Sequence, residues 1–194
     1  MGGRLIYLMG PSGSGKDTVL QGLSRLLGPQ CYLAPRLVTR QQTDTERGAI
    51  SVSEAEFMRL ERRGALAMAW RANGLCYGVP SEINLRLAAG KDVLLNGSRE
   101  YLPEARKRYP GLVPVLLKVD AATLRRRLLC RGRETQEQIG RRMDRNANYE
   151  SLVDSADSHA IMVIDNSREA EQAIRELYQY LYPLGAESME PSCS

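Results

Sequence analysis

The chain has 194 residues, 43% of them hydrophobic, so it is long enough to bury one sizeable core and too short for two comfortable domains. Its formal net charge is +4, and only four of its 27 basic residues are lysines. Nucleic-acid binding is disfavoured, because it needs a basic stripe interleaved with aromatic residues and the chain has one Phe and one Trp. The arginine excess indicates either phosphate recognition by planar guanidinium groups or arginines spread over a solvated surface.

The cysteines give no sign of a metal or disulfide framework. Cys31, Cys76, Cys130 and Cys193 lie far apart, without a CxxC pair or a neighbouring His. The apolar run at residues 5–9 is too short for a signal peptide or a membrane span. We therefore expect a cytoplasmic protein with no membrane partner.

The chain begins with a predicted strand, turn and helix. Residues 4–9 predict a buried strand, residues 10–15 a turn, and residues 16–27 a helix. The apolar positions of that helix recur at helical spacing, and they are Val19, Leu20, Leu23, Leu26 and Leu27. Residues 37–39 then predict a second, short strand.

Helices and strands alternate through the middle of the chain. A capping box formed by Ser53 and Glu56 predicts a helix that stops at Gly64, and residues 66–70 favour an extended conformation. The elements predicted next are a helix at 82–89 ended by Gly90, a buried strand at 93–95, a helix at 100–109 before Pro110, and a strand at 113–119.

The last third of the chain contains a break between two predicted helices. Asp120 caps a helix through Leu129, and a polar run at 131–136 separates it from a helix that ends near Tyr149. We expect this break, at about 130–137, to be a mobile lid.

A strand at 160–164 and a helix at 168–182 complete the predicted order, and residues 183–194 are expected to form a disordered tail. The alternation predicts a single α/β domain over residues 1–182, with a parallel central sheet and helices on both faces.

The turn after the first strand carries a phosphate-binding pattern. Its residues, Gly10, Pro11, Ser12, Gly13, Ser14, Gly15 and Lys16, fit G-x-x-x-x-G-K between a strand and a helix. Glycines let backbone N–H groups surround anionic oxygens, and the helix adds the positive end of its dipole. Lys16 places a charge near the β and γ phosphates, so the sequence predicts that this loop binds ATP.

The residue after Lys16 departs from the usual pattern. A Ser or Thr that holds Mg²⁺ is expected there, whereas this chain has Asp17 followed by Thr18. A carboxylate is also a hard oxygen ligand, so Asp17 is a candidate metal ligand, with Thr18 as a second candidate. The alternative is that Asp17 only favours the helix N-terminus electrostatically.

These motifs resemble the guanylate kinase-like group of P-loop kinases, from Arg4 to about Tyr182. Beyond the phosphate loop, the segments that carry the resemblance are Val38-Thr39-Arg40, Tyr77-Gly78, Arg131-Gly132-Arg133 and Arg141-Arg142-Met143. The resemblance implies a three-layer P-loop kinase fold in which the Arg131 to Arg133 segment belongs to the lid.

The departures from that group concern the recognition of guanine. Met68 falls where guanylate kinases have a Glu that reads the base, and a thioether cannot accept two hydrogen bonds from guanine. The segment 96–99, Asn-Gly-Ser-Arg, stands where an Asp-x-Asp sequence is expected. The acceptor-phosphate motif is reduced to Glu46-Arg47-Gly48.

This combination resembles the ribose 1,5-bisphosphate phosphokinases of phosphonate catabolism, through residues 9–17, 70–78 and 96–99. The resemblance implies that ATP, with Mg²⁺, phosphorylates the 1-phosphate of ribose 1,5-bisphosphate, giving 5-phosphoribosyl 1-diphosphate and ADP. An anionic phosphate acceptor needs no general base, so fixed cations are the main requirement of such a site.

The resemblance also assigns roles to single residues. Lys16 is expected on the β and γ phosphates, and the transferring group is expected to be neutralised by Arg131, Arg133 and Arg142. The expected acceptor-binding residues are Arg40, Arg99 and Tyr77 for phosphates and Asn96 and Ser98 for ribose hydroxyls. The alternative for Arg40 and Arg99 is an ordinary surface charge.

Several other residues are expected to be structural. Met68 and Trp70 favour the core, and His159 lies beside a predicted buried strand. Arg125, Arg126 and Arg127 are expected mostly to face solvent, because three consecutive residues cannot share one helical face.

Three alternatives to this function remain at the level of sequence. They are a guanylate kinase with a displaced base reader, a kinase for another small phosphorylated acceptor, and a non-catalytic guanylate kinase-like binding module. The module is disfavoured because such modules typically lose the lysine of the phosphate loop and the lid arginines. The sequence does not indicate an oligomeric state.

Overall fold

The computed structural model describes residues 2–40, 49–130, 132, 135–150 and 161–183, and it describes only the backbone of residues 142 and 145–150. Strands in these ranges form one sheet of five and one of four. None of the helices in the described ranges has both the length and the apolar character that crossing a membrane requires.

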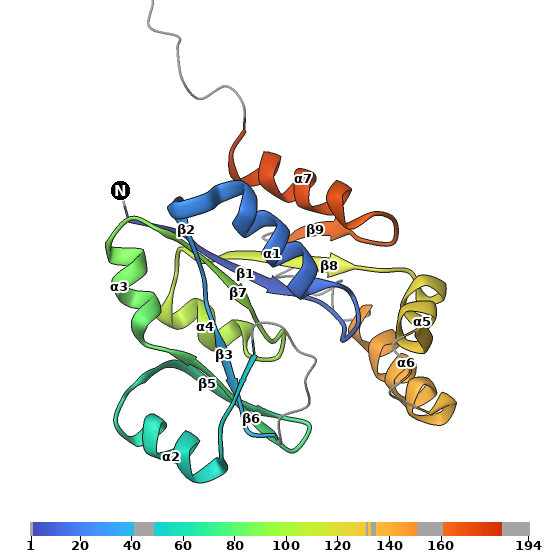
Figure 1. Ribbon diagram of the computed structural model, residues 1–194, viewed down its shortest axis with the longest axis horizontal. Coiled ribbons are helices and arrows are strands. Elements are labelled where there is room, and N and C mark those ends of the chain that lie inside the picture. The colour runs from blue at the N-terminus through green and yellow to red at the C-terminus, as the bar shows by residue number, and fades with distance from the viewer. Residues whose placement is uncertain (1, 41–48, 131, 133–134, 151–160, 184–194) are drawn as a thin grey trace, which may run out of the picture.

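The five-stranded sheet lies at the centre of the molecule (Figure 1). All its strands are parallel, in the order β2 (Cys31–Leu33), β7 (Asp92–Asn96), β1 (Leu5–Met9), β8 (Val113–Lys118) and β9 (Met162–Asp165). The strand order reverses at β1, since β7 lies on one side of it and β8 on the other. At such a point a crevice forms at the carboxyl ends of the strands, where ligands bind in open α/β sheets.

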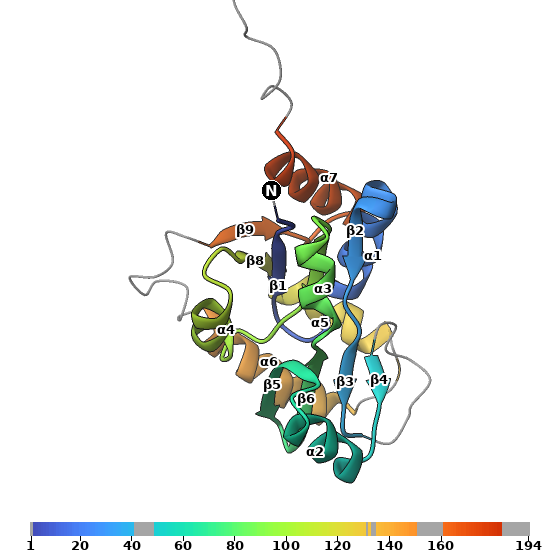
Figure 2. The ribbon, with the colours of Figure 1, turned by 90° about the vertical axis from the view of Figure 1, so that its left-hand side faces the viewer.

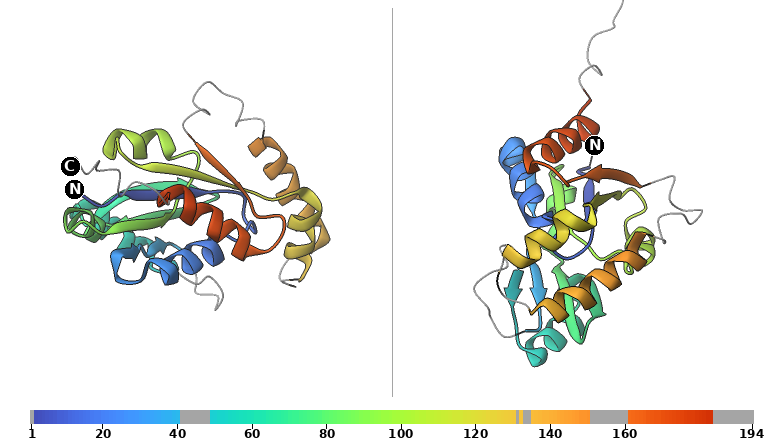
Figure 3. Two further views of the ribbon diagram at one scale, coloured as in Figure 1. Left: turned by 90° about the horizontal axis from the view of Figure 1, so that it is seen from above. Right: turned by 90° about the vertical axis from the view of Figure 1, so that its right-hand side faces the viewer.

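Helices cover both faces of this sheet, as the sequence predicts (Figure 3, left). One core packs alternate residues of β1 against α3 and α4, and a second packs the other residues of β1 against α1 and α7. All five residues of β1 are buried, as expected for a parallel strand with two covered faces. The bounds are α1 (Lys16–Leu27), α3 (Glu82–Ala88), α4 (Leu102–Arg108) and α7 (Ala170–Leu181).

The four-stranded sheet lies below the first in Figure 2, with α2 (Glu54–Arg62) beside it. Its order is β4 (Ala49–Ser51), β3 (Arg36–Val38), β6 (Leu75–Pro80) and β5 (Leu66–Ala72), and β6 runs antiparallel to both neighbours. The sequence prediction of a single parallel sheet therefore missed this second sheet. It also missed the short strands β2, β4 and β6.

The hairpin of β5 and β6 does have a signal in the sequence. Asn73 and Gly74, with φ of 51° and 73°, form the two-residue turn between Ala72 and Leu75. An Asn-Gly pair between two strands favours the type I′ turn, because both central residues of that turn need positive φ. The pair therefore indicates a second strand after residues 66–72.

The predicted helix boundaries agree with the structure where capping residues mark them. The Ser53 hydroxyl accepts a hydrogen bond of 3.1 Å from Glu56 N at the start of α2, which confirms Ser53 as the N-cap, while the Glu56 carboxylate pairs with Arg59. The helix α1 has its predicted bounds and is followed by the short 3-10 helix η1 (Gly28–Gln30). Leu26, predicted to belong to the apolar stripe of α1, is 57% exposed. It projects about 100° around the helix from Leu27, beyond the buried face.

The helices α5 (Ala121–Cys130) and α6 (Gln136–Glu150) pack together beyond the carboxyl ends of the central strands (Figure 3, right). Asp120 caps α5 as predicted, since its Oδ1 accepts a hydrogen bond of 2.8 Å from Thr123 N. At the start of α6, Thr135 and Gln138 exchange backbone-to-side-chain hydrogen bonds of 2.9 and 3.3 Å, which form a second capping box. Arg131, Arg133 and Glu134, in the segment predicted as a lid, lie outside the described residues.

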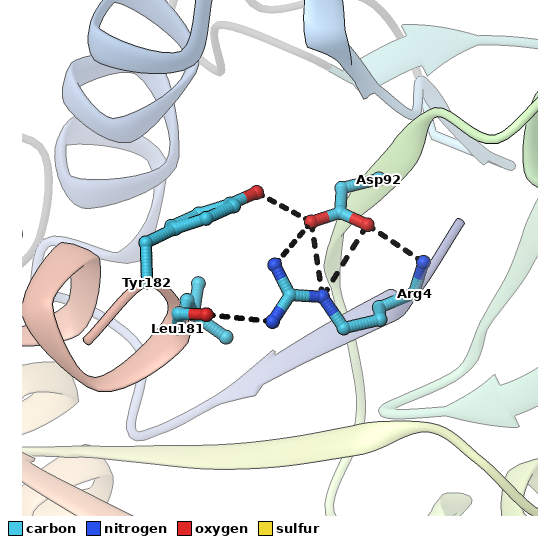
Figure 4. Close-up of polar contacts among 4 residues, drawn as sticks. All are labelled: Arg4, Asp92, Leu181 and Tyr182. Carbon is cyan, nitrogen blue, oxygen red and sulfur yellow. Dashed lines mark hydrogen bonds and ion pairs between the residues drawn. The ribbon is translucent and has the colours of Figure 1, made fainter. Parts of the chain in front are cut away.

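A polar network joins the first strand to the end of the last helix (Figure 4). Arg4 donates to the Asp92 carboxylate through Nη2 at 2.7 Å and through its backbone N at 2.7 Å, and its Nη1 donates to Leu181 O at 2.7 Å. The hydroxyl of Tyr182 donates to the same carboxylate, and the guanidinium of Arg4 lies 4.6 Å from the centre of the Tyr182 ring. Three distant segments of the chain therefore meet at one carboxylate.

The network shifts the pKa values of both partners of Arg4. Burial and the hydrogen bond to Asp92 raise the pKa of Tyr182 to about 12. Burial alone would raise the pKa of the Asp92 carboxyl, but the hydrogen bonds from Arg4 and Tyr182 outweigh burial and hold it below its ordinary value. The folded state therefore favours an ionised Asp92 beside a protonated Tyr182.

We predict that Tyr182→Phe lowers the free energy of unfolding by about 1–2 kcal/mol, because a buried carboxylate loses one donor. The Tyr182 hydroxyl stabilises the fold fully below pH 10, and this contribution is lost as the pH rises toward the folded-state pKa of about 12. In urea titrations the difference between the two proteins should therefore shrink above pH 10. Tyr180→Phe, at a 50% exposed position of the same helix, is the matched control. An effect of the same size in the control would contradict the assignment.

Candidate active site

The phosphate loop connects β1 to α1 at the carboxyl edge of the central sheet. Lys16 Nζ donates to the carbonyl oxygens of Gly10 at 2.7 Å and Pro11 at 2.9 Å. Within the loop, Ser14 N donates to Pro11 O at 3.1 Å. The predicted strand, loop and helix unit is thus present, with the lysine ammonium held against the loop.

The helix α5 packs directly against this loop. A Cβ atom added at Gly13 would lie 3.0 Å from side-chain carbons of both Leu124 and Leu128, and Gly13 has a φ of 96°. Glycine is favoured here because a side chain would be strained at this φ and would press on the ends of both leucines. The helix that leads into the predicted lid is therefore in contact with the phosphate loop.

Two side chains that the sequence interpretation did not assign to the site hold the carbonyl of Ser14. Asn166, which is 1% exposed, donates to Ser14 O at 2.7 Å through Nδ2. Arg127 donates to the same oxygen at 3.3 Å and to Arg168 O at 3.1 Å. In a planar trans peptide the C=O and N–H point in opposite directions, so these contacts also orient the N–H of Gly15.

The sequence does contain a signal for Arg127. Arg125 and Arg126 are exposed, as predicted, but Arg127 is half-buried. Arg127 lies three residues after Leu124 and one before Leu128, and these two leucines define the buried face of the helix. The expectation that three consecutive arginines face solvent was therefore wrong for the one that shares the buried face.

Asp17 and Asn96 meet at the same edge of the sheet. Parallel pairing of β1 with β7 places Leu8 opposite Asn96, so the phosphate loop and Asn96 both follow carboxyl ends of adjacent strands. Asn96 Nδ2 donates to Asp17 Oδ1 at 2.8 Å. Asn96 is 9% exposed, and its buried Oδ1 has no hydrogen-bond partner among the described residues. Thr18, the second metal candidate, is exposed at the next position of α1.

The segment that follows Asn96 is fixed by Tyr7 of β1. The buried Tyr7 hydroxyl donates to Ser98 O at 2.8 Å and accepts from Ser98 N at 3.0 Å. A Cβ atom at Gly97 would lie 2.2 Å from the Tyr7 ring, so the chain can pass here only without a side chain. Ser98 and Arg99 are thereby held next to the strand that carries the phosphate loop.

Tyr77 lies in the second sheet, in a stack of aromatic rings. Its ring is 5.6 Å from the ring of Trp70, which stacks on Tyr101 at 5.4 Å, and the Arg36 guanidinium lies 5.3 Å from the Tyr77 ring. Trp70 is 8% exposed, and Met68 is fully buried in the same core. The prediction that Met68 and Trp70 are core residues is confirmed.

Arg40 follows the end of β3, two residues after Val38, which pairs with Tyr77. It lines a cavity of about 410 Å³ together with Thr39, Ser53 and Cys76, among others. The Thr39 hydroxyl accepts a hydrogen bond of 2.8 Å from Cys76 N, which ties β3 to the hairpin beside this cavity. The predicted acceptor-binding residues thus come from both sheets: Asn96, Ser98 and Arg99 from the first, Arg40 and Tyr77 from the second.

The remaining predicted residues are not described. Arg131 and Arg133, expected to neutralise the transferring phosphoryl group, and His159, expected to be structural, lie outside the described residues. Arg142 belongs to α6, of which the structure describes only the backbone at that position.

Comparison with known proteins shows what the whole chain is similar to. A family model described as "AAA domain" matches residues 6–151. The "Ribose 1,5-bisphosphate phosphokinase PhnN" of Pseudomonas paraeruginosa is 48% identical over 182 residues, covering 93% of this chain and 96% of that protein. The proteins of the same name from Pseudomonas fluorescens and Azotobacter vinelandii are 44% and 46% identical, over 91% and 93% of this chain and 94% and 97% of their own lengths.

Among solved structures, the crystal structure of guanylate kinase from Anaplasma phagocytophilum superposes with a TM-score of 0.67. The two chains are 19% identical, over 95% of this chain and 88% of the other. At this identity the similarity establishes the guanylate kinase-like fold and nothing about the substrate.

We predict that Asn166→Ala weakens nucleotide binding and lowers the free energy of unfolding by about 1–3 kcal/mol, because the Ser14 carbonyl loses its buried donor. Calorimetric titration with ADP and urea unfolding measure the two effects. Gln179→Ala, at an exposed position of α7, is the control. Unchanged ADP affinity in the Asn166 variant would show that the contact does not shape the loop.

Proposed function

The chain belongs to the AAA domain family and, within it, to the ribose 1,5-bisphosphate phosphokinases, and from this premise we propose that it transfers the γ-phosphoryl group of ATP to the 1-phosphate of ribose 1,5-bisphosphate. The products are 5-phosphoribosyl 1-diphosphate and ADP. Its substrates are therefore small molecules, ATP and a phosphorylated sugar.

The burial of Met68 is the structural observation that carries the choice of acceptor. The resemblance to guanylate kinases places the Glu that reads guanine at this position. The Met68 side chain is fully buried in the core with Val79 and Trp70. A buried thioether offers no pair of acceptors to a nucleobase. The phosphate-binding loop, by contrast, retains its lysine and its strand and helix context, so the donor site is kept while the group that would read a base in the acceptor is absent.

The transfer itself needs positioning and charge neutralisation more than acid–base chemistry. An oxygen of the acceptor 1-phosphate forms a bond to the γ phosphorus as the bond to the β,γ-bridging oxygen breaks, and no proton has to move. Lys16 Nζ, now on the carbonyl oxygens of Gly10 and Pro11, would bind the β and γ phosphates. Arg131, Arg133 and Arg142 would neutralise the transferring group, which keeps the role that the family resemblance gives them.

The acceptor would be held by residues from the two sheets. Arg40, Arg99 and Tyr77 would bind its phosphates, and Ser98 and Asn96 its ribose hydroxyls. Ser98 and Arg99 are well suited to this role because Tyr7 fixes their backbone. A fixed backbone reduces the entropy that the site loses when it orders around the acceptor.

The residues present fit a magnesium ion that accompanies the nucleotide. Mg²⁺ prefers oxygen ligands and is usually bound by one or two carboxylates together with substrate phosphates. The Asp17 carboxylate supplies such oxygens beside the phosphate loop, and the Asn96 amide donates to one of them. The described residues contain no group of three or more His, Cys, Asp or Glu side chains that would hold a metal alone. When bound, Mg²⁺ would neutralise charge on the β and γ phosphates.

We also place the protein in the cytoplasm. Cys31, Cys76 and Cys130 are free thiols in the described part of the chain, and this state is the one that a reducing compartment maintains.

An acceptor assay tests the function directly. We expect ADP formation from Mg²⁺ and ATP with ribose 1,5-bisphosphate, and little or none with GMP at the same concentration. Turnover with GMP alone would make the protein a guanylate kinase. Absence of turnover with any phosphorylated acceptor, from folded protein, would favour the binding module.

We predict that Lys16→Ala lowers kcat/KM by about 10²-fold or more, because the charge on the β and γ phosphates loses its fixed cation. The unfolding midpoint should change little, since the ammonium contacts only carbonyl oxygens of its own loop. Lys107→Ala, at a position whose side chain is 71% exposed, is the control and should retain activity. A fully active Lys16 variant would contradict the assignment of the loop.

A further inference from the structure

Asp17 and Asn96 both depart from the usual pattern of P-loop enzymes, and the structure brings the two departures together. In that pattern a Ser or Thr hydroxyl follows the lysine, and a carboxylate at a neighbouring position completes the Mg²⁺ site. In this chain the carboxylate follows the lysine, and the neutral side chain stands at the end of β7, beside β1. Their side chains are 2.8 Å apart although 79 residues separate them in the sequence.

We propose that the carboxylate of the metal site has been transposed from the strand to the helix, with Asp17 supplying it and Asn96 acting as the residue that positions it. This inference rests on the proposed kinase function, because it concerns the metal that accompanies the nucleotide. Asn96 then acts on the donor side of the reaction through Asp17, in addition to any contact with the acceptor.

The chemistry of the amide explains why Asn96 suits this position. A carboxylate only accepts hydrogen bonds, so the amide must turn its Nδ2 to Asp17, and its Oδ1 then points elsewhere. An Asp at position 96 would place two carboxylates in contact within a buried site, where like charges repel strongly. An apolar residue would leave the direction of the Asp17 carboxylate undetermined.

The side-chain oxygen of Asn96, Oδ1, supports the presence of a ligand. Asn96 Oδ1 is buried and without a hydrogen-bond partner among the described residues. Such a group costs free energy unless a ligand or a water molecule satisfies it. A ligand atom or a water molecule on the side of the amide away from Asp17 would satisfy this oxygen, while Nδ2 keeps the carboxylate in place.

The test measures the affinity for ADP by calorimetry, with Mn²⁺ as the metal and, in parallel, with EDTA. The ratio of the two affinities is the gain due to metal. We expect Asn96→Ala to reduce this gain by about 10-fold or more, as loss of a positioning partner usually does. Asp17→Ser should reduce it further, and in Asn96→Ala, which removes no charge, the affinity in EDTA should fall much less than the affinity in Mn²⁺. Gln179→Ala, at an exposed position of α7, should change neither affinity.

The double variant D17S/N96D decides whether the carboxylate has changed places. It restores a hydroxyl after Lys16 and a carboxylate at the end of β7, so it should regain about 10-fold or more of the metal-dependent gain that Asp17→Ser loses. Equal gains in the double and single variants would overturn the transposition. A loss of affinity in EDTA that matches the loss in Mn²⁺ would reduce Asn96 to a packing role and overturn its positioning role.

None of these measurements involves the acceptor. If the expected pattern is found with ADP but there is no turnover with ribose 1,5-bisphosphate, the transposed carboxylate would be supported and the proposed substrate would be wrong. The two ideas can therefore fail separately.

Discussion

The parallel pairing of β1 with β7 is the interaction on which the rest of the site depends. It sets Leu8 opposite Asn96, so the strand that enters the phosphate loop and the strand that ends in Asn96 stop at the same level. From β1, Tyr7 fixes Gly97 and Ser98, and from the first turn of α1, Asp17 reaches Asn96. A shift of one residue in this register would move every side chain of β7 to the opposite face of the sheet.

The phosphate loop concentrates polar groups that the rest of the fold does not satisfy. Buried side-chain oxygens of Ser14, Asn96 and Asn166 have no hydrogen-bond partner among the described residues, and each residue belongs to the loop, contacts it, or contacts Asp17 directly after it. Natural proteins leave few such groups, and those that occur are often functional. The free energy that they cost must be offset elsewhere, and the two cores on either side of β1 are the main source of that stability.

The second sheet separates this chain from a nucleobase kinase of the same fold. Met68 and Trp70 pack into the core, and the rings of Tyr77 and Tyr101 stack on either side of the indole. Buried aromatic stacks of this kind contribute both buried area and a preferred ring geometry. The region that the sequence comparison associates with guanine recognition is therefore built as structure in this protein, whereas the phosphate loop keeps its binding groups.

Features that depend on neighbouring residues could be predicted from the amino-acid sequence. The phosphate loop, the capping residues Ser53 and Asp120 and the buried run of β1 could be predicted because each pattern lies within a few residues of chain. The strands β2 and β4 were missed because three residues carry little periodicity, and β6 was missed although the Asn73-Gly74 turn before it indicates a second strand. Only the tertiary structure decided that Asn96 holds Asp17 and that Asn166 and Arg127 hold the Ser14 carbonyl. These contacts join residues that are 79 to 152 positions apart, and sheet register and helix packing set their distances, which no local pattern records.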